Sequence, residues 1–327
     1  MAEQKHWPMT DRIRIGISAC LLGHTVRFDG GHKRDPFLVE TFGPFVEWVP
    51  VCPEVELGLG TPRPTLRLER ARENKAAVRL VMPSTGNDYT AAMQRYAARR
   101  VNALSADDLC GYVLKKDSPS CGMERVKVYG RTTIPEKSGR GLFADALLQR
   151  LPLLPVEEEG RLNDPHLRES FVERVFAYRR LRTLFAERWT VGGLVAFHSA
   201  HKLQLLAHST AAYERLGRLV AGAGTRPRPA VRAQYETEFM RALQVLATRR
   251  RHVNVLQHIT GYFRKRLEDD SRHELLSLVD DYGRGLVPLI VPLTLVRHHV
   301  RRFQIPYLQG QTYLEPHPKE LMLRNHV

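Results

Sequence analysis

The sequence predicts an α/β first domain, built on a Rossmann-like parallel sheet, followed by an all-α helical second domain. The chain has 327 residues, about twice the usual domain length of roughly 100–200. Strand-like and helix-like stretches alternate in the first half, whereas the second half has a helical pattern. We therefore place an α/β domain at 1–155 and a helical domain at 156–327. The acidic segment 151–165, which contains prolines, is the predicted linker.

The first domain is expected to contain short β-rich strands separated by a helix. The stretch 88–104 has the apolar spacing of an amphipathic helix. The expected strands are 13–19, 45–51, 77–82 and 110–116. Because strands joined through helices pair in parallel, we expect one parallel sheet.

The second domain is expected to be a bundle of helices that ends in an aromatic and proline-bearing tail. Its one conspicuous break is the segment 222–229, GAGTRPRP. The expected helices are 165–189, 192–221, 231–249, 251–270, 272–283 and 286–302.

Composition places the chain among ordinary globular proteins, with 43% hydrophobic and 26% charged residues. The most apolar window, 285–296, is interrupted by Pro288 and Pro292, and it is shorter than the about 20 residues of a membrane span. We therefore expect a cytoplasmic protein without a membrane partner. Four cysteines in such a chain favour metal binding or catalysis over disulfides.

The net charge of +15 is concentrated in the second half, where residues 161–327 carry 27 basic and 15 acidic side chains. Such a one-sided potential favours a polyanion partner, most simply nucleic acid, over a basic surface that serves solubility alone. We name as RNA-binding candidates two basic clusters and a pair on a helix: Arg249, Arg250, Arg251, Arg264, Lys265, Arg266, His201 and Lys202.

Three cysteines follow predicted strands directly. Cys20 follows 13–19, Cys52 follows 45–51, and Cys121 follows 110–116 in the loop KDSPSCG. Because the carboxyl ends of parallel strands lie at one sheet edge, we expect the three thiols to converge there. Cys110 begins its strand at the opposite end and is expected to be a packing residue.

Three converging thiolates without a fourth protein ligand fit a metal centre that keeps one position open. A Cys₃ zinc site of the deaminase type brings a Cys-x-x-Cys pair and a nearby His-x-Glu, and the sequence has neither. A [4Fe–4S] cluster bound at three irons fits better. The alternative is three inert buried cysteines.

Long motifs of the first half resemble the thiouracil desulfidase family, also called domain of unknown function 523. The motifs are GISACLLGHTVRFDGGHKRD, VCPEVELGLGTPRPTLRL, LKKDSPSCGMERVKVY and GRGLFA. The second half, with LVAFHSAHKLQLLAHSTAAYERLGRLVA, NVLQHITGYFRKRL and IPYLQGQTYLEPHP, is similar to the YbgA-like family 1722. The fusion of the two resembles tRNA 4-thiouridine desulfidases. Phe28 departs from the tyrosine expected in the VRYDG motif.

The resemblance implies that Cys20, Cys52 and Cys121 hold a [4Fe–4S] cluster and that substrate sulfur binds the open iron. A thiocarbonyl is a soft ligand, so the cluster would remove sulfur as a Lewis acid without net electron transfer. Glu54 is the expected acid, with a pKa raised by burial, and Glu56 is the runner-up. Ser118 is expected to orient water or substrate.

These features predict an enzyme that removes sulfur from 4-thiouridine in tRNA and releases sulfide. One alternative is a desulfurase of free thiolated bases such as thiouracil, and another is an RNA-binding protein whose cluster is structural or senses redox state. The oligomeric state stays open, as does the role of the helix face that carries His198, His201 and His208. Arg63 and Arg67 are expected to contact phosphate, or to pair with Glu69.

Overall fold

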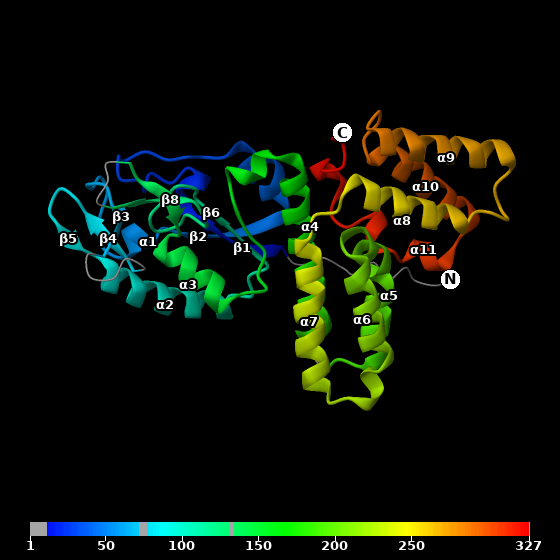
Figure 1. Cartoon of the computed structure of the whole chain (residues 1–327), viewed down its shortest axis with the longest axis horizontal. Helices are drawn as coiled ribbons and strands as arrows, with labels where there is room; N and C mark the ends of the chain where they lie inside the picture. The colour runs from blue at the N-terminus through cyan, green and yellow to red at the C-terminus, as the bar shows by residue number, and fades with distance from the viewer. Residues whose placement is uncertain (1–11, 72–76, 131–133, 187, 327) are drawn as a thin grey trace. The chain divides into compact units, whose positions relative to one another are not determined.

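The computed structural model describes residues 12–71, 77–130, 134–186 and 188–326 (Figure 1). The chain divides into two compact units, residues 10–164 and residues 165–327. The division lies later than the expected boundary at 155, because the expected linker contributes strand β9, Val156–Glu158, to the first unit. The first two residues of the acidic run, Glu157 and Glu158, are therefore part of a strand.

The first unit contains a four-stranded sheet in which every pairing is parallel, so the predicted α/β class is confirmed. The strand order is β2-β1-β6-β9. The central strands are buried because their apolar side chains are covered on both faces. The strands are β1 Ile13–Ser18, β2 Val46–Val51, β6 Gly111–Leu114 and β9 Val156–Glu158.

A second sheet of five short strands, with the order β5-β4-β3-β7-β8, was not anticipated beyond the segment 77–82. Four of its strands have at most four residues and carry polar residues, so neither alternation nor apolar content marks them. Its pairings are antiparallel except for that of β3 with β7. The strands are β3 Arg67–Arg70, β4 Val78–Met82, β5 Asn87–Asp88, β7 Val126–Tyr129 and β8 Glu136–Gly139.

Within its described residues, the first unit has three α-helices. Helix α2 was predicted, whereas α3 was not. Tyr96 of α2 and Tyr112 of β6 both contact the ring of Phe143 in α3, with centroid distances of 6.4 and 5.9 Å. These buried aromatic contacts fix the helix pair to the parallel sheet. The helices are α1 Pro53–Glu56, α2 Thr90–Ala106 and α3 Leu142–Arg150.

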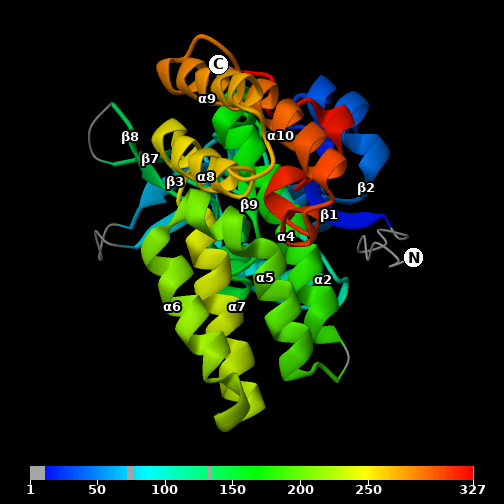
Figure 2. The ribbon, with the colours of Figure 1, turned by 90° about the vertical axis from the view of Figure 1, so that its right-hand side faces the viewer.

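The second unit is helical, as expected. The predicted helix 192–221 is two helices, because Ser209 caps the second by accepting a hydrogen bond from the Ala212 amide. Figure 2 shows α5, α6 and α7 side by side. The helices are α4 Pro165–Ala186, α5 Val191–His208, α6 Thr210–Ala221, α7 Arg228–Gln244, α8 Arg249–Gly261, α9 Asp269–Arg284, α10 Ile290–Phe303 and α11 Pro306–Gln309.

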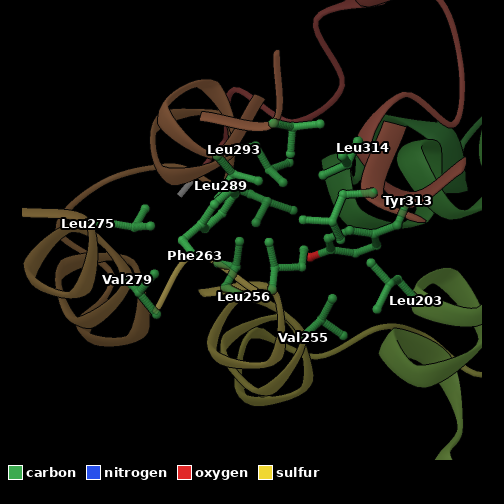
Figure 3. Packing of buried hydrophobic residues seen from close by; sticks show 14 of the residues in the cluster. Leu203, Val255, Leu256, Phe263, Leu275, Val279, Leu289, Leu293, Tyr313 and Leu314 are labelled. Carbon is green, nitrogen blue, oxygen red and sulfur yellow. The ribbon is translucent and has the colours of Figure 1, made fainter. Parts of the chain in front are cut away.

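One hydrophobic core of this unit joins α8, α9 and α10 to the end of α5 and to the C-terminal tail (Figure 3). Leu256, Phe263 and Leu293 are fully buried there, together with Tyr313 from the tail. The aromatic tail is thus a packing element, because its rings fill the space between helices. Among the described residues, no helix is long and apolar enough to cross a membrane.

Candidate active site

Cys20, Cys52 and Cys121 meet at one cavity of about 340 Å³ beside the parallel sheet. Cys20 lies in the turn that follows β1, and Cys52 precedes the first turn of α1 after β2. Cys121 ends the loop that follows β6. Because β1 pairs in parallel with both β2 and β6, the three strand ends are neighbours.

Burial raises the pKa of all three thiols above their ordinary value. The pKa of Cys20 rises to about 11, and those of Cys52 and Cys121 also rise, with desolvation as the largest cause in each case. The thiols are therefore neutral at neutral pH unless a cation compensates the thiolate charge. A bound metal centre does this, because a coordinating thiol is deprotonated outright.

Three thiols that line one cavity provide the donors and the space that a multinuclear cluster needs. Among the residues that the structure describes, no three His, Cys, Asp or Glu side chains lie close enough to hold one metal ion. A multinuclear cluster separates its ligands more widely and needs a cavity between them, which the three cysteines line. Three thiols therefore fit a cluster in which one iron has no protein ligand.

Cys110 lies away from this cavity. It precedes β6 at the amino end of the strand, where it is fully buried. Its amide donates to the Arg14 carbonyl at 2.8 Å, and its Sγ lies 3.7 Å from the Asp108 carbonyl oxygen. It is not among the residues that line the cavity, in agreement with its predicted packing role.

Glu54 lines the cavity and is held by a buried arginine. Its Oε2 accepts hydrogen bonds from Nε and Nη2 of Arg63 at 3.0 and 2.6 Å, and its Oε1 accepts one from Ser120 Oγ at 2.8 Å. The Arg63 side chain is only 4% exposed. Because Arg63 and Ser120 already donate to both carboxylate oxygens, the hydrogen-bond geometry suits a proton acceptor as well as the acid that the sequence predicts.

The two arginines that were expected to contact phosphate pair with carboxylates instead. Arg63 is occupied by Glu54, and it also donates to the Val26 and Gly60 carbonyls at 3.1 and 2.8 Å. Arg67 pairs with Glu69, with Nε at 2.7 Å from Oε1, which was the stated alternative.

Glu56 is outside the cavity lining and has a structural role. Its Oε1 accepts a hydrogen bond from the Cys52 amide at 3.1 Å. Its Oε2 accepts from Tyr96 Oη at 2.7 Å and pairs with Arg100 Nε at 3.1 Å. Glu56 thus anchors the Cys52 turn to α2, and the geometry favours Glu54 for proton transfer.

Ser118 shapes the loop that carries Cys121 and also lines the cavity. Its Oγ accepts hydrogen bonds from the amides of Cys121 and Ser120 at 3.1 and 3.3 Å. A Cβ at Gly122 would approach Val126 Cγ2 to 2.3 Å and the Ser118 carbonyl oxygen to 2.8 Å, so only glycine permits this tight turn. Both oxygen lone pairs of Ser118 serve the loop, which leaves its proton available to the cavity.

Two buried acids, Glu158 at the end of β9 and Glu159 just after it, position the same loop, a role that the sequence did not predict. Glu158 Oε1 accepts from the Met123 amide at 2.6 Å. Glu159 accepts from the Lys116 amide at 2.8 Å and forms a close ion pair with Lys115, which lines the cavity beside Cys20. The signal was the acidic run itself, since three adjacent acids at a strand end need cationic or amide partners.

The basic clusters of the second unit are largely exposed. Arg249, Arg250, Arg264, Lys265 and Arg266 are exposed, Arg251 is partly buried, and Lys202 is partly buried on α5.

His201 corrects one of the RNA-binding predictions. It is fully buried, and its Nδ1 donates to the Phe197 carbonyl at 2.7 Å. Burial lowers its pKa to about 3. It therefore stays neutral and cannot reach RNA. His198 and His208 are buried as well, so the helix face with these histidines belongs to the interior of the unit.

Comparisons with known proteins agree with the two-part organisation. Residues 15–159 match the family model of 2-thiouracil desulfurase, and residues 202–318 match that of a protein family of unknown function, DUF1722. The Uncharacterized protein YbgA of Escherichia coli strain K12 is 35% identical over 158 residues, which cover 48% of this chain and 94% of YbgA. A solved structure, the [4Fe-4S]-dependent thiouracil desulfidase TudS, is 34% identical, and the match covers 49% of this chain and 100% of that chain with a TM-score of 0.40.

The chain belongs to the family of YbgA, and its residues 15–159 match the 2-thiouracil desulfurase model. The resemblance inferred from the sequence motifs is thereby confirmed. The desulfurase match covers the unit that contains the cysteine cavity, so the first unit is an enzyme domain. The second unit contains the DUF1722 match.

Proposed function

We propose that this protein is a [4Fe–4S]-dependent desulfidase that converts 4-thiouridine in tRNA to uridine. The net reaction exchanges the thiocarbonyl sulfur for a water oxygen and releases hydrogen sulfide, with no change of oxidation state. The observation that supports it most directly is a set of three thiols, of which two are buried and that of Cys52 is partly buried, around one cavity that Glu54 and Ser118 also line. The desulfurase family match supports the same chemistry on thiolated uracil.

In this proposal Cys20, Cys52 and Cys121 hold the cluster. When bound, the cluster supplies a soft Lewis acid for the substrate sulfur. The match to the 2-thiouracil desulfurase model covers residues 15–159, which include all three cysteines, and this supports their common role.

Glu54 is proposed to accept a proton next to the thiols, and Ser118 is proposed to orient water or substrate there. The Glu54 carboxylate, fixed by Arg63 and Ser120, takes a proton from the attacking water. The Ser118 hydroxyl donates a hydrogen bond into the cavity and orients water or the pyrimidine ring. Arg27, Lys33 and Lys116 line the same cavity and give its surroundings a positive charge that favours an anionic, phosphate-bearing substrate.

The proposal that the substrate is tRNA depends on the basic residues of the second unit. Its exposed clusters at 249–251 and 264–266 provide cations for an RNA backbone. One observation favours a free thiolated base as a second candidate: all residues that line the cavity lie in the first unit, so the chemistry needs no side chain from the second.

Two substrates compared in one experiment test the proposal. The protein is purified without oxygen, its iron and sulfide are measured, and sulfide release is followed with thiolated tRNA and with free 4-thiouracil. The variant Arg249→Ala/Arg250→Ala/Arg251→Ala should lose turnover of tRNA and retain turnover of the free base. Its affinity for tRNA should also depend less on salt, by about 0.7–0.9 in slope for each cation lost.

Equal loss of both activities, or of neither, would contradict the tRNA assignment. Sulfide release from the free base alone would support the second candidate. Binding of tRNA without release of sulfide from either substrate would contradict the enzymatic proposal and leave a cluster-containing RNA-binding protein.

A further inference from the structure

A pair of stacked tyrosines lies at the surface of the helical unit, near the ends of α8 and α10. The rings of Tyr262, just after α8, and Tyr307, in α11, have centroids 5.1 Å apart and planes at 17°. His258 of α8 meets the Tyr262 ring edge-on at 5.6 Å and 76°. Tyr262 remains 39% exposed, although the next residue, Phe263, is fully buried in the core.

This exposure is unusual because the adjacent core offers burial to an aromatic ring. Phe263 packs against His299 and Phe303 of α10, with centroid distances of 5.7 and 6.3 Å. Tyr262 instead presents an aromatic surface to solvent and is supported from behind by Tyr307. A rigid, partly exposed aromatic ring is a platform on which another flat ring can stack.

Basic side chains gather beside this platform. The turn after Tyr262 carries Arg264, Lys265 and Arg266, and the last turn of α10 carries Arg301 and Arg302. Arg266 Nη1 donates to the Phe303 carbonyl at 2.6 Å, which ties the turn to the end of α10 and brings the two basic groups together.

Most of these cations are not used by the fold. Within the described part of the chain, the side chains of Arg264, Lys265 and Arg301 form neither an ion pair nor a hydrogen bond. The acids that follow, Asp269 and Asp270, lie in the first turn of α9, where the helix dipole favours negative charge. The cations therefore remain available to an anionic partner.

We propose that Tyr262, supported by Tyr307, stacks against an unpaired base of RNA while Arg264, Lys265 and Arg301 bind the flanking phosphates. An aromatic platform among free cations is how proteins hold single-stranded nucleic acid, since every base has a stacking face and every nucleotide a phosphate. The proposal rests on the proposed function in one respect, that the substrate is carried by RNA. It also assigns this surface a preference for unpaired over base-paired segments.

Binding, measured without turnover, tests the platform. The full chain is titrated against a fluorescein-labelled single-stranded oligoribonucleotide of about 12 nucleotides, within the usual range of site sizes. Tyr262→Ala should weaken binding by about tenfold, because stacking of one base is lost. Tyr262→Phe should bind within about twofold of the wild type, and Tyr89→Ala in the first unit is the matched control.

A ligand-side test does not depend on how a variant folds. An abasic strand of the same length should bind the wild type about as weakly as the normal strand binds Tyr262→Ala. Tyr262→Ala should bind the abasic strand about as well as it binds the normal strand, because the same stacking contact is missing in both cases. For the cations, Arg264→Ala/Lys265→Ala/Arg301→Ala should lower the salt slope by about 2, at roughly 0.7 for each phosphate contact with a single strand. The exposed pair Arg95→Ala/Arg99→Ala on α2 is the charge control.

Unchanged RNA affinity in Tyr262→Ala would overturn the proposal, as would equal affinity for the abasic and normal strands. Binding to anionic phospholipid vesicles that is stronger than binding to RNA, and that the triple variant abolishes, would assign the surface to a membrane instead. Sulfide release from free 4-thiouracil is followed in parallel. If that activity is absent while base-dependent RNA binding persists, the proposed desulfidation fails and the platform stands.

Discussion

Glu54 and Arg63 form a two-point ion pair at the wall of the cysteine cavity, with Nε and Nη2 of the arginine at 3.0 and 2.6 Å from the same carboxylate oxygen. The guanidinium is nearly inaccessible to solvent. The second carboxylate oxygen accepts a hydrogen bond from Ser120 at 2.8 Å. Glu54 is therefore fixed in position before any substrate arrives.

This geometry predicts that Glu54→Gln retains the cluster and loses desulfidation. An amide keeps the shape of the side chain but cannot accept a proton, and a positioned base typically contributes about 10²–10⁴ in rate. Iron and sulfide content should match the wild type, while sulfide release falls at least a hundredfold. A fall of less than tenfold would show that another group or solvent takes the proton. Glu56→Gln is the neighbouring control and should affect stability more than rate.

Ser118→Ala should separate loop positioning from chemistry. The substitution removes the acceptor of two loop amides and the hydroxyl proton that faces the cavity. We expect most of the activity to be lost with iron retained, because Cys121 also remains held by the buried loop around Gly122. Ser118→Thr, which retains the hydroxyl, should recover part of the rate. Loss of iron in Ser118→Ala would mean that the serine acts only by holding the cysteine loop.

Replacement of each cysteine tests the thiol assignment. Cys20→Ser, Cys52→Ser and Cys121→Ser should each lose the brown colour and most of the iron, because three thiolates around one cavity leave no spare ligand. Cys110→Ser is the matched control, a buried cysteine at the other end of β6, and should retain iron and activity. Full iron content in any of the first three variants would contradict the assignment.

A buried pair in the helical unit predicts a pH dependence of stability. His208 Nε2 lies 3.5 Å from Glu173 Oε1, and both side chains are buried. Although burial alone lowers the pKa of His208, the Glu173 carboxylate raises it overall. The folded state therefore binds a proton more tightly than the unfolded chain. The stabilisation is complete below the unfolded pKa of about 6.5 and is lost as the pH rises through the folded value.

Thermal unfolding monitored by circular dichroism at several pH values between 6 and 9 would show a melting temperature that declines with pH. Glu173→Gln should remove most of this decline, because His208 then loses the carboxylate that raises its pKa. The variant should also be less stable by about 3–5 kcal/mol, the usual cost of breaking a buried ion pair. A decline of the same size in Glu173→Gln would assign it to other groups.

The positions of the cysteines were predictable from sequence because they depend on local patterns. Strand-forming stretches before Cys20 and Cys52, and the strand before the Cys121 loop, are short runs with clear boundaries. Parallel pairing then places their carboxyl ends together without further information. The same logic correctly separated Cys110, which precedes its strand.

The sequence by itself thus determined the two-part organisation, the parallel sheet and the meeting of three thiols. Only the tertiary structure decided that Glu54 pairs with Arg63 and that His201 is buried while Tyr262 is exposed. Backbone periodicity is local, so a single chain segment reveals it. The partner of a charge and the burial of a ring depend on which distant segments pack against them, and those contacts form only when the whole unit folds.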